Sequence, residues 1–494
     1  MLLLLSLSCS DKITQSPKDE FQFRAPEEMP PLRGPGGPSQ QFSDDQLWIN
    51  CAFLEGGESD VDHHNLVVPY RGHLLLPWAP EWGQGGLSFF EMDDPCNPVK
   101  VGEGFHERMR ESHALGLLHL PDEEEFAGDY VITAGILGIQ VWDVTDVEHP
   151  EMINYLEIEG VFYPDSYTRV VLSVFWQHPW LYVAAADNGI FVLNTEDPTQ
   201  PEVVNQYSFG VPLRAAGVFA IGNNLLVTSA EGSGAEVLDI SDPANPQAIP
   251  GGRFEATDSE GNPYEAYHGN LAGPWAMFAR KEGGGGIMIT DISDPENPTF
   301  VADVHSEGGN GGYVFYDEGF GFLGDSHWGI VYDLSDTDDI IEVGRGYLSG
   351  DLDTMTPYGN VAVLSVDDES IEGQSSAIMP WQNSPDITGP IPWHIVPSDG
   401  ETNLPLTSRI GIGFNEPIEP SSAFAGSIRL YDSEGKAIDG WVTAQENTVN
   451  YSPKTPLEPA TTYYIEVLKG GVQDINGNTV TETITSQFTT SGSQ

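Results

Sequence analysis

A short phrase recurs six times along this chain of 494 residues and limits its fold more than any other feature. Two clear copies read AEVLDISDPANP at residues 235–246 and GIMITDISDPENP at residues 286–298. Around each copy, apolar residues alternate or form short β-branched and aromatic runs that end at Gly, Asn, Asp or Pro. Such runs predict four-stranded blades, and a repeat of this length is typical of a propeller or solenoid, whose units bury their faces against one another. The matching aspartates are 42 to 52 residues apart: Asp94, Asp146, Asp197, Asp242, Asp294 and Asp336.

The repeated aspartate follows an apolar strand, where its carboxylate can accept backbone N–H groups of the next turn. In four copies a proline comes directly after it, which presets the turn and removes a donor that the strand ladder does not need. A metal-ligand role is the alternative. Because turn capping explains the phrase without a metal, we interpret all six aspartates as structural.

The phrase resembles the LVIVD repeat of surface-associated β-propellers. The resemblance extends over about residues 60–395 and is best in VLDISDPANP and ITDISDPENP, whereas the copy with Asp336 lacks both prolines. We expect a propeller over residues 47–395 with seven blades; six or eight are the alternatives. The outer strand of the last blade is either PWHIV at 392–396 or LWINCAF at 47–53, the latter closing the ring.

The pattern changes at Val396, after which short alternating strands predict a β-sandwich. FNEPI, PLEPATTYY, DINGN and QFTT resemble, in this order, the SbsA-type bacterial Ig-like domain. The resemblance implies a stalk or interaction module and names no ligand. DINGN (474–478) and DSEGN (258–262) look like acidic calcium loops without the full ligand set, so we interpret them as Asx-type turns. The expected fold is therefore all-β: a seven-bladed β-propeller followed by an Ig-like β-sandwich over residues 396–494.

The chain contains 75 acidic and 19 basic residues, a net charge of −56. Such a surface repels nucleic acids and anionic lipid headgroups, so we expect neither as a partner. The acidic residues are spread through ordered-looking segments with 10% aromatic residues, which argues against disorder.

The N-terminus, MLLLLSLSCSDK, is too short to span a bilayer and ends in small residues before a cysteine. Residues 1–9 resemble a bacterial lipoprotein signal, which implies that Cys9 carries lipid after cleavage. The absence of basic residues before the leucines and the loose Ser6-Leu7-Ser8 match depart from that pattern, and a simple secretory peptide is the alternative. The Pro-, Gly- and Ser-rich residues 10–46 predict a flexible tether. We expect an exported protein anchored by lipid at the outer membrane or cell surface.

Two cysteines remain if Cys9 carries lipid. Cys51 lies just before the first blade and Cys96 lies in that blade's Asp-Pro turn. An even pair of cysteines in an exported protein is a disulfide candidate.

Long connections from one blade to the next, such as residues 103–113 and 255–268, indicate the working face, because long loops on rigid scaffolds usually carry function. Two interpretations of its polar residues are open: they plug the channel and neutralise carboxylates, or they form a ligand or metal site. No two of them have zinc-ligand spacing, and the sequence contains no G-x-S-x-G, H-E-x-x-H, P-loop or C-x-x-C motif. The candidates for ligand binding are His113, Arg169, Arg214, His268 and Asp353 near the channel mouth, with Trp82, Tyr264 and Trp328 in the loops.

These features favour a non-catalytic binding scaffold without a cofactor, whose partner is a cell-envelope or extracellular protein or a glycan. One alternative is an exported hydrolase or oxidoreductase with a divalent metal held by His113, His268 and Asp353 at the channel mouth. Another is a purely structural component of the cell envelope. Enzymatic activity is left open.

If Cys9 carries the anchor, Cys9→Ser should move the protein from the membrane fraction to the soluble fraction. The measurement is the partition of the protein between the two fractions after cell lysis. Unchanged membrane partition of the variant would contradict the lipid anchor.

Overall fold

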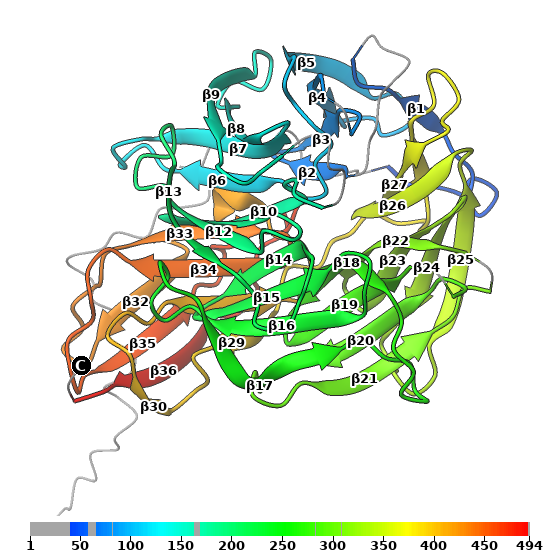
Figure 1. The fold of residues 1–494 in the computed structure, drawn as a ribbon. Helices are drawn as coiled ribbons and strands as arrows, with labels where there is room; N and C mark the ends of the chain where they lie inside the picture. Colours follow the sequence, from blue (N-terminus) through cyan, green and yellow to red (C-terminus); the bar gives the residue numbers. More distant parts are fainter. Residues whose placement is uncertain are drawn as a thin grey trace, which may run out of the picture.

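The computed structural model describes residues 40–57, 66–81, 83–162, 168–281, 283–307 and 309–492. Within these ranges the chain forms nine four-stranded sheets and one short 3₁₀ turn, η3 (Pro420–Ser422) (Figure 1). The described residues include no helix that is long and apolar enough to cross a membrane. Cys9 and Trp82 lie outside the described residues.

Seven of the nine sheets in the described part of the chain form a ring, the β-propeller. The first strand of each sheet lies near the first strand of the next, as in β18, β22 and β26, so these strands line the centre. From the centre outwards, the sheets are β2 (Val68–Tyr70), β3 (His73–Trp78), β4 (Gly85–Glu91), β5 (Val99–His106); β6 (Gly116–Leu120), β7 (Gly128–Gly135), β8 (Gly138–Asp143), β9 (Glu151–Glu157); β10 (Ser173–Gln177), β11 (Trp180–Ala184), β12 (Ile190–Asn194), β13 (Glu202–Tyr207); β14 (Ala215–Ile221), β15 (Asn224–Ser229), β16 (Gly234–Asp239), β17 (Gln247–Glu255); β18 (Ala266–Ala272), β19 (Trp275–Arg280), β20 (Ile287–Asp291), β21 (Thr299–Val304); β22 (Gly311–Asp317), β23 (Phe320–Asp325), β24 (Trp328–Asp333), β25 (Ile341–Tyr347); and β26 (Asp351–Tyr358), β27 (Val361–Asp368), β28 (Ser376–Pro380), β1 (Ala52–Leu54).

The core lies between adjacent sheets. Strands such as β3 and β7 are buried along their whole length because both faces are covered, whereas the outermost strands, such as β13, are largely exposed. One apolar cluster joins the second and third sheets, and another joins the last sheet to the first. The ring therefore has no unpaired apolar face at its junction.

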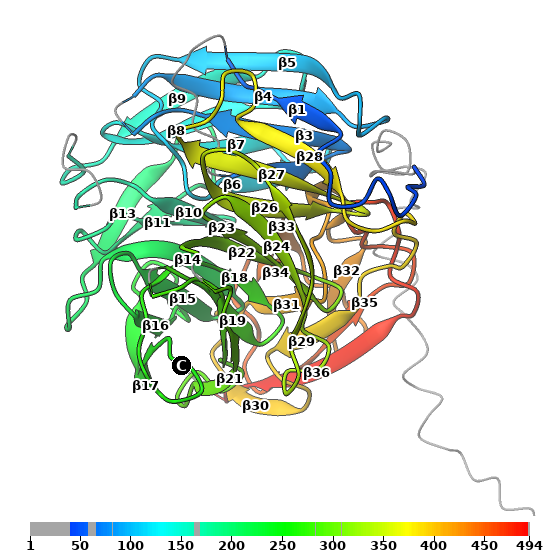
Figure 2. The ribbon, with the colours of Figure 1, turned by 90° about the vertical axis from the view of Figure 1, so that its right-hand side faces the viewer.

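The N-terminal strand closes this ring. Ala52, Phe53 and Leu54 of β1 pair antiparallel with β28 (Figure 2), so LWINCAF supplies the outer strand of the last sheet. PWHIV forms β29 (Pro392–Val396) and pairs with β31 of the sandwich instead. The expected domain boundary at residue 396 thus falls at the end of the sandwich's first strand.

The repeated phrase forms a hydrogen-bonded turn between the third and fourth strands of a sheet. Five of the six aspartates accept the backbone N–H two residues ahead at 2.9–3.2 Å: Asp94, Asp146, Asp197, Asp294 and Asp336. The sixth, Asp242, accepts the side-chain amide of Asn245 at 2.8 Å. A second polar residue, three positions earlier, accepts an N–H in the same way at 2.7–3.0 Å: Asp143, Asn194, Asp239, Asp291 and Asp333.

The C-terminal domain is a sandwich of two sheets around its own apolar core. Its strands pair antiparallel except for β30 and β36, which pair parallel. The sheets are β29, β31 (Ile410–Phe414), β34 (Thr448–Pro453) and β33 (Gly440–Gln445), and β30 (Glu401–Leu404), β36 (Ile484–Thr490), β35 (Thr462–Val467) and β32 (Ile428–Asp432).

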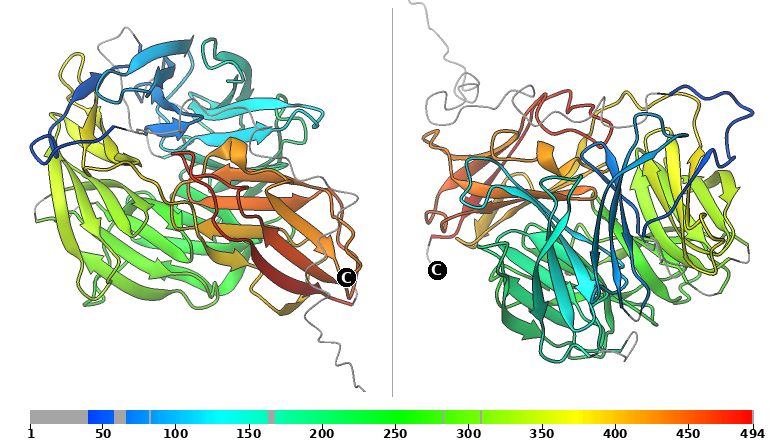
Figure 3. Two further views of the ribbon diagram at one scale, coloured as in Figure 1. Left: turned by 180° about the vertical axis from the view of Figure 1, so that it is seen from behind. Right: turned by 90° about the horizontal axis from the view of Figure 1, so that it is seen from above.

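The sandwich packs against one face of the ring, where β33 and β34 lie near β6, β10 and β14 (Figure 3). This face carries the tight turns that follow the innermost strands. Asn450 of β34 is buried there; its Nδ2 donates to the Ala220 carbonyl, and its Oδ1 accepts from Gly222 N, both at 2.8 Å. Asn447 Nδ2 donates to the Tyr316 carbonyl at 3.0 Å. Buried amides of the sandwich therefore satisfy backbone groups that the propeller turns leave unpaired.

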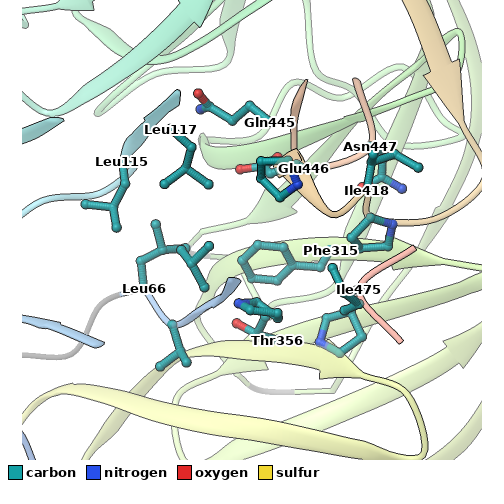
Figure 4. Close-up of a pocket in the computed structure, with 16 residues that line it drawn as sticks. Leu66, Leu115, Leu117, Phe315, Thr356, Ile418, Gln445, Glu446, Asn447 and Ile475 are labelled. Carbon is teal, nitrogen blue, oxygen red and sulfur yellow. The ribbon is translucent and has the colours of Figure 1, made fainter. Parts of the chain in front are cut away.

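The tip of the β33–β34 hairpin closes the centre of the ring on this side. It borders a cavity of about 50 Å³, with Leu66 and Leu117 on one side and Ile418 on the other (Figure 4). Burial raises the pKa of Glu446 at the tip to about 7, against a hydrogen bond from Asn270 Nδ2 of 2.7 Å that lowers it. The opposite face, with the long loops, is the one that the sandwich leaves uncovered.

Cys51 and Cys96 form a disulfide in the structure, with a Cα–Cα distance of 5.1 Å. It joins the segment before β1 to the Asp94 turn between β4 and β5, so it ties the closing strand to the first sheet. Replacing both cysteines by serine should lower the free energy of unfolding by about 3–4 kcal/mol, because the crosslink lowers the conformational entropy of the unfolded chain. Urea denaturation of the variant and parent measures this difference.

Peptide mass spectrometry without reduction tests the bond itself. Two free thiols in native protein, or equal stability of parent and variant, would contradict the crosslink.

Candidate functional site

The candidate residues lie on the long-loop face, where the innermost strands begin. His113 precedes β6, and its backbone N–H donates to the Leu172 carbonyl at 3.0 Å. His268 lies on β18, in the fifth sheet. The structure brings these two side chains together across the centre of the ring: His113 Nδ1 and His268 Nε2 are 2.6 Å apart, and both residues are buried.

Neighbouring groups hold this pair in place. The His268 ring stacks on Tyr313 of β22 at 4.4 Å between ring centroids, with planes only 4° apart. His113 Nε2 lies 3.3 Å from Glu111 Oε2. The pair therefore sits in a row of buried polar groups from three elements, and it bonds to side chains as well as to backbone.

Asp353 belongs to the same region but does not complete a metal site with the histidines. It is buried on β26, and no described group forms a hydrogen bond with its Oδ1. Burial raises its pKa well above the usual range; the nearby Lys281 lowers it, and Asp367, Asp351 and Glu111 raise it further. Among the described residues, the three metal-binding side chains whose ligand atoms lie within 4.8 Å of one another are Asp386, Glu416 and Asp474, which lie elsewhere.

The two arginines lie apart from the histidine pair. Arg214 forms ion pairs with Asp187, at 2.9 Å, and with Glu231. Arg169 is exposed, with its guanidinium 5.2 Å from the ring centroid of Phe162. Arg214 thus neutralises local carboxylates, which was the plainer of the two interpretations open from the sequence.

The loop aromatics differ in exposure. Arg280 lies 3.5 Å over the ring of half-buried Tyr264. Trp328, at the start of β24, is 39% exposed and makes an edge contact with Tyr347, which is 51% exposed.

Four residues of this region were not predicted from the sequence: Tyr347, Glu111, Tyr313 and Glu446. Of these, only Glu111 lies near a predicted candidate in the sequence, two residues before His113.

Two family models match parts of the chain. Residues 386–490 match the bacterial Ig-like domain, and residues 282–305, in the fifth sheet, match the LVIVD repeat. The protein is thus a β-propeller with an LVIVD repeat, followed by a bacterial Ig-like domain.

Solved propellers superpose on it only loosely. BamB from Moraxella catarrhalis is 13% identical with a TM-score of 0.41, covering 66% of this chain and 96% of its own. The WD40 propeller domain of Doa1 is 12% identical (TM-score 0.45; 68% and 95% covered), and the periplasmic gluconolactonase PpgL of Pseudomonas aeruginosa is 9% identical (0.43; 59% and 86%). No curated protein sequence matches the chain. These similarities carry no argument about a ligand.

The buried histidine gives a pH-dependent prediction. Burial lowers the pKa of His268 well below 6.5, and His113 and Lys281 lower it further, so native His268 stays neutral in mild acid. The unfolded chain gains the proton below about pH 6.5, so this contribution to stability is present above that pH and is lost as pH falls. Compared with the parent, His268→Gln should lose less unfolding free energy on acidification, by about 1.4 kcal/mol per pH unit below 6.5.

Urea denaturation between about pH 5 and pH 7 measures this difference. His149→Gln is the control, because His149 is exposed and its bond to Asp146 raises its pKa. Identical pH dependence of the parent and His268→Gln would contradict the buried, neutral state.

Proposed function

We propose that this protein is an exported, lipid-anchored binding scaffold without catalytic activity, which takes its ligand on the long-loop face of the propeller. The observation that carries the proposal is the asymmetry of the ring. The hairpin of the Ig-like domain covers the centre of the short-turn face, so a ligand can approach the centre only from the other side.

Exposed aromatic side chains support this choice of face. Four of them lie on strand ends or loops there, with 39–58% of their surface exposed: Phe105, Phe162, Trp328 and Tyr347. Large rigid aromatic rings with partial exposure are the side chains that most often anchor a partner.

The charges of this face favour a ligand without strong charge. Three of its arginines form ion pairs with neighbouring carboxylates: Arg108–Glu157, Arg253–Glu236 and Arg345–Glu342. We therefore favour a glycan, or an uncharged protein surface, of the cell envelope or exterior. His113 and His268 shape the floor of this face rather than touch the ligand, because both are buried.

The lipid anchor at Cys9 and the tether of residues 10–46 would hold the propeller away from the membrane. What supports them is the N-terminal sequence alone. The high negative charge, −56, disfavours direct contact with anionic lipid or nucleic acid. The Ig-like domain then serves as a rigid base for the ring, because its buried amides fix it to the propeller.

Binding to a glycan array and to immobilised envelope protein extract tests the proposal. Trp328→Ala should weaken the binding seen with the parent by roughly tenfold or more, which is about 1.4 kcal/mol, the loss expected for an aromatic anchor. Phe300→Ala is the matched control: Phe300 is 42% exposed but follows the Asp294 turn at the far end of its sheet.

The control variant should bind as well as the parent. Absence of binding by the parent to every probe, or an equal loss in Trp328→Ala and Phe300→Ala, would contradict a ligand on the long-loop face.

A further inference from the structure

A buried cluster of carboxylates lies where the propeller, the linker and the Ig-like domain meet. Asp386 comes from the linker after β28, Glu416 follows β31, and Asp474 belongs to the DINGN turn. One ligand atom from each lies within 4.8 Å of the others, and Glu416 and Asp474 are at most 1% exposed. Three segments far apart in the sequence therefore direct negative charge into one enclosed place.

The charges that act on Glu416 are all negative. Burial raises its pKa far above the usual range, and Asp474, Asp317, Glu318 and Asp386 raise it further. A second buried carboxylate, Asp129, has the opposite surroundings. Burial alone would raise its pKa, but His119 at 2.9 Å and Arg71 at 2.5 Å lower it overall. A buried carboxylate needs such compensation, and no basic side chain is among the described groups that most affect Glu416.

Two buried oxygen atoms, one in the cluster and one on a neighbouring side chain, have no hydrogen-bond donor among the described residues. Glu416 Oε1 is buried, and no described group forms a hydrogen bond with it. The same holds for Oδ1 of Asn476, which is 7% exposed and whose Nδ2 donates to Asp386 Oδ2 at 3.2 Å. Buried acceptors without donors are rare and call for an unseen partner such as an ion.

We propose that Asp386, Glu416 and Asp474 bind a calcium ion at the junction of the two domains. All of these donors are oxygen atoms, which excludes the nitrogen and sulfur sets preferred by zinc and copper. Calcium accepts six to eight oxygen ligands in flexible geometry, whereas magnesium demands a near-ideal octahedron and keeps several waters. Carboxylates from three separate segments suit the more tolerant ion.

The site would join the linker, the Ig-like domain and the propeller. Asp317 and Glu318, at the turn between β22 and β23, add the negative charge of the propeller to the same place. The hydroxyl of Thr388, in the linker, donates to Glu318 Oε1 and Asp386 Oδ1 but carries no positive charge to offset theirs. A bound cation would thus fasten the linker and the Ig-like domain beside the sixth sheet.

The chain supplies a matched control for the test. DSEGN in the β17–β18 loop folds into the same turn as DINGN: Asp258 accepts Glu260 N and Asn262 N at 2.9 and 2.8 Å, and Asp474 accepts Asn476 N and Asn478 N at 2.8 and 2.9 Å. Asp258 does not belong to the carboxylate cluster. Asp258→Asn and Asp474→Asn therefore disturb equivalent turns, and only the second removes a proposed ligand.

The experiment is calorimetric titration of calcium chloride into EDTA-stripped protein at about 0.15 M ionic strength, where interactions among exposed charges are screened. We expect one saturable calcium site in the parent and in Asp258→Asn. Asp474→Asn and Glu416→Gln should lower the calcium affinity by roughly 100-fold or more, since even outer partners of metal ligands cost about 10–100-fold. Calcium should also raise the melting temperature of the parent and Asp258→Asn, but not of Asp474→Asn.

Asp386→Asn, at a half-buried position of the linker, is the further variant if either buried substitution prevents folding, and it should lose affinity as well. The proposal is overturned by the absence of saturable calcium binding, or by equal affinity in the parent and every folded cluster variant, which would indicate weak surface binding. Tighter binding of magnesium than of calcium overturns the assignment of the ion. Identical melting temperatures with calcium and with EDTA also overturn the site. This result is expected if protons alone neutralise the carboxylates.

Discussion

Closure of the ring is the constraint on which the rest of the structure depends. Each propeller sheet has two apolar faces and can bury them only against its two neighbours, so an open ring would leave two faces in water. The strand before the first sheet solves this by completing the last one: β1 pairs with β28, and Leu54 packs in one cluster with Leu74, Val361 and Ile378. Because β1 lies so close to the first sheet in sequence, the Cys51–Cys96 crosslink can hold both sides of the junction together.

A closed ring still has two open ends, and this chain treats them differently. At the short-turn end, innermost strands finish with backbone groups that lack strand partners, and Asn447 and Asn450 of the sandwich bond to them. At the long-loop end the described residues place no further domain, and the buried row of Glu111, His113 and His268 lies at the centre. The polar docking surface explains why the Ig-like domain is fixed in one orientation, since a purely apolar contact would permit sliding.

The sequence predicted the parts of the structure that repeat. Apolar runs and Asp-Pro turns recur at a regular interval, so every copy supports the same interpretation, and the all-β propeller with a C-terminal sandwich follows from them. It also offered LWINCAF as a closing strand, but PWHIV fitted equally well, because alternation of apolar residues does not identify a pairing partner.

The candidate site was harder to predict from the sequence, since it depends on contacts between residues that are far apart along the chain. His113 and His268 meet across 155 positions, whereas Arg214, with the same place in its own sheet, turns to Asp187 and Glu231. The positions of these residues in the sequence do not predict which of them meet at the centre of the ring.

The acidic composition explains why the domain junction is the place for a cation. Acidic residues on the surface are solvated and cost little, but a chain with 75 acidic residues has only 19 basic residues with which to neutralise the carboxylates that become buried. At Asp129 it uses Arg71 and His119. At Glu416 and Asp474 no described basic side chain is among the main influences, and the alternatives are a shared proton or a metal ion. The DINGN turn fixes the position of one of these carboxylates, because Asp474 accepts three donors from Asn476 and Asn478. Burial and Asp386 nevertheless raise the pKa of Asp474 to about 8, so this cluster of carboxylates has to bind either protons or a cation.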